Sequence, residues 1–275
     1  MKKLLLLLTI FLFILAGCSQ EKETTGNEKA QDNAQEVITL KVASLIPPMT
    51  EILDIVKPKL AEQSINLEMV VLGDNVQPNT ALAAGEVDAN FFQHVPYMEQ
   101  FNRSNDANLV PIVPIYFANY GTYSKEYNSM DELPEESVIA IANDISNIDR
   151  SLTLLAQHGE ITLKEKTDNY YTIADIVENP KNYKFAEVDL LMLARMYDDA
   201  DAVIMTPAYA APLGLTPKSD ALLTEGSEND FAITLIARKD NAESEAIQKL
   251  AEAMTSPEVR EFLEKNYEET AIPAF

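Results

Sequence analysis

Short runs of apolar, often β-branched residues alternate with helical patterns from Val37 to the end of the 275-residue chain. Such alternation is typical of α/β domains, in which helices connect the strands of largely parallel sheets. The runs predict strands at residues 38–44, 67–72, 87–91, 112–116, 137–142, 202–206 and 231–238.

Helical spacing is clearest in two regions of this body. Residues 50–63 carry apolar side chains at near-helical spacing, with Pro58 placed to kink the helix. Near the C-terminus, one helical face carries Ile247, Leu250, Ala251 and Met254. Ser256 and Pro257 then predict the N-cap and first turn of a further helix, which continues through Val259, Phe262 and Leu263.

The N-terminal segment differs from the rest of the chain. Lys2 and Lys3 precede about thirteen apolar residues, against the roughly twenty that span a bilayer, so residues 1–17 are expected to be a secretory signal peptide. The run ends in Leu-Ala-Gly-Cys, which resembles a bacterial lipobox. Cys18 is the only cysteine, so an intramolecular disulfide is excluded and lipidation, for example with palmitate, explains an unpaired thiol in an exported protein. The alternative is an incidental cysteine in an ordinary signal peptide.

Residues 19–36 contain no aromatic residue and no aliphatic residue larger than alanine. Such a composition cannot form a packed core, and we expect residues 18–36 to be a disordered tether behind the lipidated cysteine. Residues 37–275 remain, enough for one large domain or two smaller lobes.

Charge argues against two classes of partner. The formal net charge of −23 becomes −25 when Lys2 and Lys3 leave with the signal peptide, which opposes binding to nucleic acid or to an anionic membrane surface. Solubility alone accounts for this acidity.

Motifs for catalysis are scarce. The chain has two histidines, His94 and His158, and lacks HExxH, CxxC, GxSxG and Walker A sequences. We therefore expect neither an enzyme nor a metal or other cofactor site, although the many carboxylates leave carboxylate-pair chemistry open.

The segment DANFFQHVPY, residues 88–97, gathers three aromatic residues, a histidine and two amides at the end of a predicted strand. Open α/β sheets bind ligands at the carboxyl ends of their strands, and aromatic rings suit an alkyl or thioether side chain. The alternative is that Phe91 and Phe92 are core residues and His94 is a polar cap.

A second polar segment, residues 143–150, follows an apolar strand and leads into a helix starting near Ile148. Arg150 could hold a carboxylate through two parallel hydrogen bonds, in a bidentate, two-pronged arrangement. The alternative is an exposed arginine on the helix surface that pairs with Asp144 or Asp149.

With these two segments in view, the chain resembles the NlpA family of methionine-binding lipoproteins, the solute-binding components of methionine ABC importers. The resemblance covers nearly the whole mature body. It rests on Val76–Asn79 (VQPN), the DANFFQHVPY run, Asn143 and Asp144 with Asn147 and Arg150, Asp175 and Ile176 before Glu178–Lys181 (ENPK), and the terminal Ile272–Phe275 (IPAF).

The resemblance implies a type II periplasmic-binding fold, in which two α/β lobes are joined by two crossing strands and the ligand lies between them. The first lobe would comprise residues 37–117 plus 239–275 and the second 118–238, with crossings near 118–123 and between 224 and 238. It also implies a monomer, anchored by lipid on the extracytoplasmic face of the membrane, that delivers a small amino acid to an ABC permease and its ATPase.

Residue roles follow from the same resemblance. Arg150 would hold the ligand carboxylate, with Asn143 and Asn147 assisting at the backbone groups. The side-chain slot would be formed by Phe91, Phe92 and Tyr97, with one orienting bond from His94.

Four positions depart from the family pattern where ligand-facing amides or a phenol are usual: Asn75, Thr206, Ala208 and Ile233. Because a buried polar group without a partner is costly, these changes are expected to alter which ligand fits. The alternatives are therefore a methionine derivative, a methionine-containing dipeptide or another apolar amino acid, and, outside this class, an enzyme on the same fold or a surface adhesin with an empty cleft.

Overall fold

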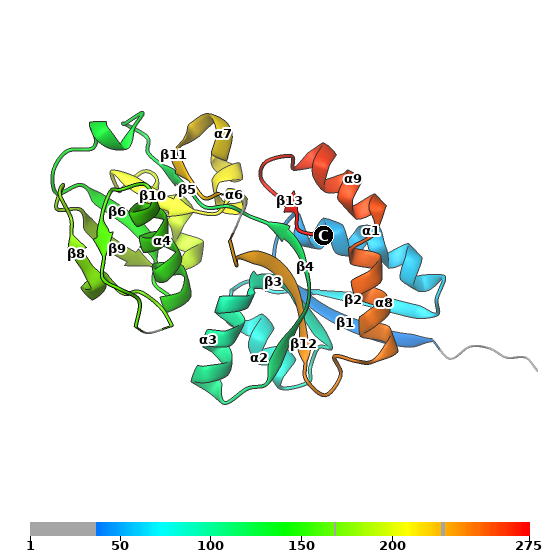
Figure 1. Ribbon diagram of the computed structural model, residues 1–275. Coiled ribbons are helices and arrows are strands. Elements are labelled where there is room, and N and C mark those ends of the chain that lie inside the picture. The colour runs from blue at the N-terminus through cyan, green and yellow to red at the C-terminus, as the bar shows by residue number, and fades with distance from the viewer. Residues whose placement is uncertain (1–36, 168, 227–228) are drawn as a thin grey trace, which may run out of the picture. The chain divides into compact units, whose positions relative to one another are not determined.

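The computed structural model describes residues 37–275 except 168, 227 and 228 (Figure 1). The expected signal peptide, Cys18 and the tether lie outside the described residues. In the part of the chain that is described, no helix is long and apolar enough to cross a membrane.

A six-stranded sheet with the order β13-β4-β12-β3-β1-β2 forms the first lobe. Its strands are β1 (Ile38–Ser44), β2 (Ile65–Val71), β3 (Ala89–His94), β4 (Leu109–Phe117), β12 (Ala232–Arg238) and β13 (Ile272–Pro273). Strand β1 pairs in parallel with β2 and β3, as the alternation of strands and helices predicts. Strand β12 runs antiparallel to both β3 and β4, so the sheet is mixed.

Helices cover both faces of this sheet because the side chains of a strand alternate between its two faces. Leu235 and Ala237 of β12 pack with α1 (Met49–Ala61), α8 (Glu245–Met254) and α9 (Pro257–Asn266), whereas Ile236 packs with α2 (Gln77–Ala83) and α3 (Val95–Asn105).

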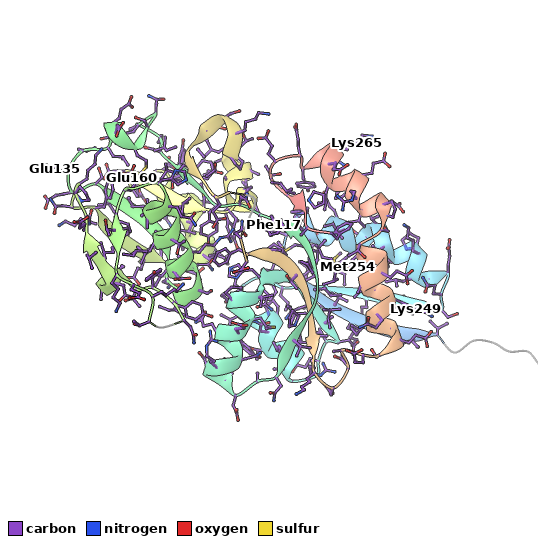
Figure 2. All side chains as sticks on the ribbon, in the orientation of Figure 1. Phe117, Glu135, Glu160, Lys249, Met254 and Lys265 are labelled. Atoms are coloured by element: carbon purple, nitrogen blue, oxygen red, sulfur yellow. The ribbon has the colours of Figure 1, made fainter. Side chains whose placement is uncertain are left out.

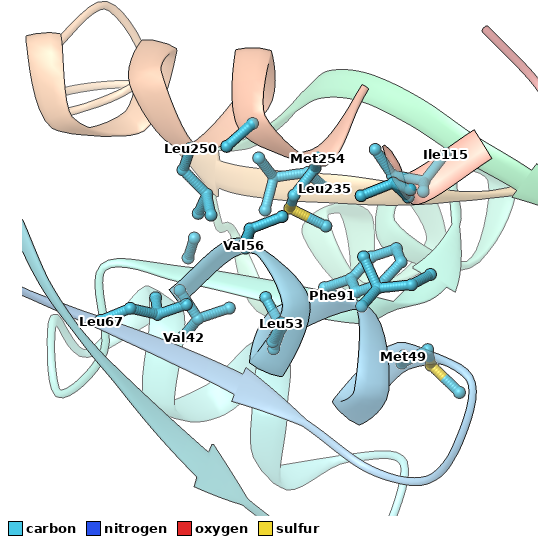
Figure 3. Close-up of a cluster of buried hydrophobic side chains, with 14 of the residues drawn as sticks. Val42, Met49, Leu53, Val56, Leu67, Phe91, Ile115, Leu235, Leu250 and Met254 are labelled. Atoms are coloured by element: carbon cyan, nitrogen blue, oxygen red, sulfur yellow. The ribbon is translucent and has the colours of Figure 1, made fainter. Parts of the chain in front are cut away.

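On the first face, Val56 of α1 and Met254 of α8 lie next to each other beside Leu235 (Figure 3). Each such buried side chain contributes about 1.5–3 kcal/mol relative to exposure. The expected helix start at Ser256 and Pro257 is confirmed, and α1 continues through Pro58 to Ala61.

A five-stranded sheet with the order β11-β5-β10-β6-β9 forms the second lobe. Its strands are β5 (Gly121–Tyr123), β6 (Val138–Ala142), β9 (Lys184–Val188), β10 (Ala202–Met205) and β11 (Ala221–Thr224). The amphipathic helix α4 (Ile145–Gln157) buries Leu152 and Leu155 against Ile139 and Ile141 of β6. The smaller elements are β7 (Thr162–Leu163), β8 (Ile176–Glu178), α5 (Leu193–Met196), α6 (Pro207–Ala210), α7 (Pro217–Asp220) and 3-10 turns at Met130–Glu132, Ile173–Asp175, Leu190–Met192 and Ala211–Leu213.

Two segments carry the chain between the sheets. The first leaves the end of β4 at Phe117 (Figure 2) and enters β5 at Gly121. The second runs from the end of β11 to the start of β12. Residues 232–238 pair with β3 and β4, so the return crossing ends before Ala232. The second lobe therefore ends before Ala232, and not at the expected residue 238.

Candidate ligand-binding site

Two strand ends, one from each sheet, bring the polar segments together. Strand β3 ends at His94, where α3 begins, and β6 ends at Ala142, just before α4. Between them lies a cavity of about 60 Å³.

Nine of the eleven ligand-facing residues expected from the sequence line this cavity. They are Asn75, Phe92, His94, Tyr97, Asn147, Arg150, Thr206, Ala208 and Ile233. The rest of the wall is formed by residues that were not expected from the sequence, namely Leu45, Ile46, Met49, Gln93, Tyr116, Ala118, Tyr120, Leu190 and Tyr209.

Phe91 and Asn143 lie elsewhere, and the expectations for them are corrected. Phe91 is fully buried in the first-lobe core, where its ring meets Tyr116 edge to face at 6.1 Å. Asn143 is exposed, and its backbone N–H donates to Val188 O of β9 at 2.8 Å. The core alternative was therefore right for Phe91, while its neighbour Phe92 reaches the cavity.

His94 is both a helix cap and part of the wall. Its Nδ1 accepts from the backbone N–H of Tyr97, so the proton resides on Nε2, which lies 3.1 Å from Asn147 Oδ1. Burial, aided by the nearby Arg150 cation, lowers the pKa of His94 from 6.5 to about 3. The imidazole is therefore neutral at physiological pH and carries a fixed donor direction.

Arg150 is buried, with 1% of its surface exposed, which excludes the surface-arginine alternative. Its Nε and Nη2 donate to Glu225 Oε1 and Oε2 at 2.6 and 2.5 Å, and Nη2 also donates to Ala118 O at 2.8 Å. The guanidinium is stacked against the rings of Tyr120 and Phe231, with its carbon 3.9 and 4.5 Å from the ring centroids.

The two aspartates proposed as surface partners of Arg150 have other roles. Asp144 caps α4 by accepting from the backbone N–H of Asn147. Asp149 accepts from Lys166 Nζ at 2.6 Å and from the backbone N–H of Tyr171 at 2.7 Å.

One nitrogen of Arg150 remains unused. Nη1 is buried and has no hydrogen-bond partner in the described structure, and Arg150 is the one charged residue among those that line the cavity. A buried donor without a partner costs about 1–3 kcal/mol, more when it is charged. The wall of the cavity therefore contains one buried cation with an unpaired donor.

Asn147 is held in place by its neighbours. Its Oδ1 accepts from Tyr120 OH at 2.7 Å as well as facing His94, and its Nδ2 donates to Asp144 at 2.8 Å. At most one amide hydrogen is left for a ligand, so the residue mainly fixes the ring positions of His94 and Tyr120.

The four departures from the family pattern all lie in the cavity wall. Asn75 is attached to both lobes, since its carbonyl accepts from Tyr97 OH at 3.0 Å and its Nδ2 lies 3.5 Å from Tyr209 OH. Ile233 pairs with His94 across the β12–β3 ladder and adds an aliphatic surface. This part of the wall is thus more apolar than amides would make it.

Glu225 is the functional candidate that the sequence did not reveal. It lies 75 residues from Arg150 along a chain rich in acidic residues. No local motif distinguishes it from the other glutamates.

Comparisons with known proteins agree with this architecture. The model of the NlpA lipoprotein family matches residues 40–275. The methionine-binding lipoprotein MetQ of Bacillus subtilis strain 168 is 36% identical over 280 residues, which covers 99% of each chain.

Solved structures give the same result. A nutrient binding protein from Burkholderia cenocepacia, bound to methionine, has a TM-score of 0.82 and 34% identity over 86% of this chain and all of that one. An ABC transporter periplasmic substrate-binding protein from Coxiella burnetii has a TM-score of 0.81 and 33% identity at the same coverage. The expected two-lobed periplasmic-binding fold is confirmed, and the chain belongs to the NlpA lipoprotein family.

Proposed function

We propose that this protein is the substrate-binding component of an ABC importer and that it binds methionine or a related small apolar amino acid between its lobes. The observation that carries the proposal is the buried, unpartnered Nη1 of Arg150, a residue that lines an otherwise largely apolar cavity. A ligand carboxylate supplies the missing acceptor.

The rest of the wall suits an apolar side chain. Phe92 and Tyr97 meet edge to face at 6.0 Å, and Leu45, Met49 and Ile233 add aliphatic surface. A thioether gains modestly from contact with aromatic ring edges, by about 0.3–1.5 kcal/mol. Methionine therefore fits the chemistry of both ends of the cavity.

The cellular arrangement is part of the same proposal. The relatives are named as lipoproteins and substrate-binding proteins, and Cys18 supplies the residue for a lipid anchor on the extracytoplasmic face. The monomeric protein would then deliver its ligand to a membrane permease driven by a separate ATPase, with no catalytic step of its own.

Calorimetry on the full-length chain in detergent tests the proposal. The protein is first unfolded and refolded to remove any ligand that was carried through purification. L-methionine, D-methionine, leucine and glycine are then titrated. Saturable binding of an apolar amino acid together with no binding of glycine supports the proposal. The absence of binding heat with all four amino acids contradicts it.

A longer ligand is the second candidate, and a specific feature favours it. A neighbouring apolar hollow of about 310 Å³, lined among others by Pro207 and Tyr267, shares four wall residues with the cavity: Ile46, Tyr116, Ala118 and Ala208. Ala208, one of these four, has a small side chain at a position where the family usually has an amide. A methionine-containing dipeptide that binds at least tenfold more tightly than L-methionine would establish this alternative.

A further inference from the structure

Glu225 occupies the segment that returns the chain from β11 to the first lobe. Its side chain is 6% exposed. Besides the two bonds from Arg150, its Oε2 accepts from the backbone N–H of Tyr120 at 2.7 Å, and its own carbonyl accepts from Asn119 Nδ2 at 3.2 Å. The carboxylate is thus fixed by donors from α4 and from the other crossing segment.

Two consequences for a ligand follow from this geometry. First, Glu225 occupies Nε and Nη2 of Arg150, so a ligand carboxylate meets Nη1 alone and a two-pronged grip is blocked. Second, the buried cation already has a buried counter-charge. Asp144 and Asp189, two further carboxylates near the cavity, accept from donors at the start of α4 and at Leu191.

We propose that Glu225 determines specificity by making the binding site electrically neutral, so that it selects ligands of zero net charge. The inference rests on the proposed function, in which Arg150 receives the carboxylate of an amino acid. A zwitterion adds no net charge to the paired cation and anion. A carboxylate without an ammonium group adds an uncompensated buried charge, which is costly in a medium of low polarity.

A purely structural role for Glu225 makes a different prediction. If the carboxylate only holds Arg150 in place, its removal weakens every carboxylate ligand by a similar factor. If it balances charge, its removal changes the ranking of ligands, because Arg150 then lacks a counter-anion and a monoanion supplies one.

The test compares Glu225→Gln with the wild-type full-length chain by calorimetry. The probes are L-methionine, which is a zwitterion, and 4-methylthio-2-oxobutanoate, the corresponding 2-oxo acid without an ammonium group. Glu160→Gln is the matched control, since Glu160 also accepts a hydrogen bond in the second lobe, from Tyr183 OH at 2.8 Å, but does not line the cavity.

We expect wild type to favour L-methionine by at least tenfold and Glu225→Gln to shift the ratio of the two dissociation constants by at least tenfold towards the 2-oxo acid. The ratio should be unchanged in Glu160→Gln. A shift below threefold in Glu225→Gln overturns the inference while leaving the proposed function intact.

The wild-type ranking gives a measurement that does not depend on how well the variant folds. Equal affinity of the wild-type chain for both probes also overturns the inference. Failure of the wild-type chain to bind either probe or any other amino acid contradicts the proposed function itself, and the two failures are therefore distinguishable.

Discussion

Replacing Arg150 by methionine separates the stability of the buried ion pair from its role in binding. The change keeps a stem of similar volume but removes the bonds to Glu225 and Ala118. The Glu225 carboxylate is left buried with the backbone N–H of Tyr120 as its remaining donor among the described contacts. Removing one member of a buried pair costs about 3–5 kcal/mol, so we expect the free energy of unfolding to fall by that amount.

The double variant Arg150→Met/Glu225→Gln should recover most of this loss, because no buried charge is left unpaired. Its affinity for L-methionine should nevertheless remain low. The end-on bond from Nη1 to a carboxylate is worth about 1.5–3 kcal/mol, or roughly a 10- to 150-fold increase in dissociation constant when it is lost.

Urea unfolding followed by far-UV circular dichroism measures the first quantity, and calorimetry with L-methionine measures the second. Arg195→Met, at an exposed arginine of α5, is the control and should change the unfolding free energy by less than about 0.5 kcal/mol. If the double variant binds L-methionine within twofold of wild type, Arg150 does not hold the carboxylate and the reasoning is refuted.

Three further predictions concern single contacts. The pKa of His94 is about 3 in the fold and near 6.5 when unfolded, so the unfolded chain binds the extra proton as the pH falls below 6.5. The free energy of unfolding should therefore fall by up to about 1.4 kcal/mol per pH unit on acidification. Urea titrations at pH 7, 6 and 5 should show a smaller dependence of this free energy on pH in His94→Gln, and an equal dependence would argue against the prediction. Tyr123→Phe removes a buried hydroxyl that has no hydrogen-bond partner among the described atoms, and should raise the free energy of unfolding by about 1 kcal/mol. A lower free energy of unfolding in this variant would show that the hydroxyl does have a hydrogen-bond partner. Tyr170→Phe deletes the hydroxyl that donates to Pro96 O at 2.8 Å and accepts from Arg103, a contact that links the loop before Ile173 to α3 of the first lobe. Ligand should dissociate about fivefold faster in stopped-flow displacement, and an unchanged rate would show that this contact does not help to retain the ligand between the lobes.

Much of the fold was readable from local pattern. The strand at residues 38–44 and the helix start at Ser256 and Pro257 were predicted with the bounds that the structure shows. Both depend on information held within a few residues, namely alternation of apolar positions and the backbone preference of proline. The family resemblance added the cavity segments, nine of whose eleven expected residues lie in the wall.

Elements defined by their partners were missed. Strands β5, β9 and β11 have three to five residues each, and their extended state comes from pairing with β10, β6 and β5. Strands β6 and β10 are equally short but continuously apolar and were predicted, whereas these three runs include glycine or polar residues. Pairing also explains the boundary near residue 238, since only the pairing of β12 shows to which sheet it belongs.

The sequence by itself therefore determined the class of fold and, through the family resemblance, nine of the residues that line the cavity, while the signal segment stays a prediction. Tertiary structure decided how those residues are used: Phe91 is turned into the core and Phe92 into the cavity, and Asn143 is left outside. It also brought Glu225 onto Arg150 across 75 residues and left one guanidinium nitrogen buried without a hydrogen-bond partner among the described residues. These outcomes depend on contacts between segments far apart in the chain, and no local periodicity or motif encodes them.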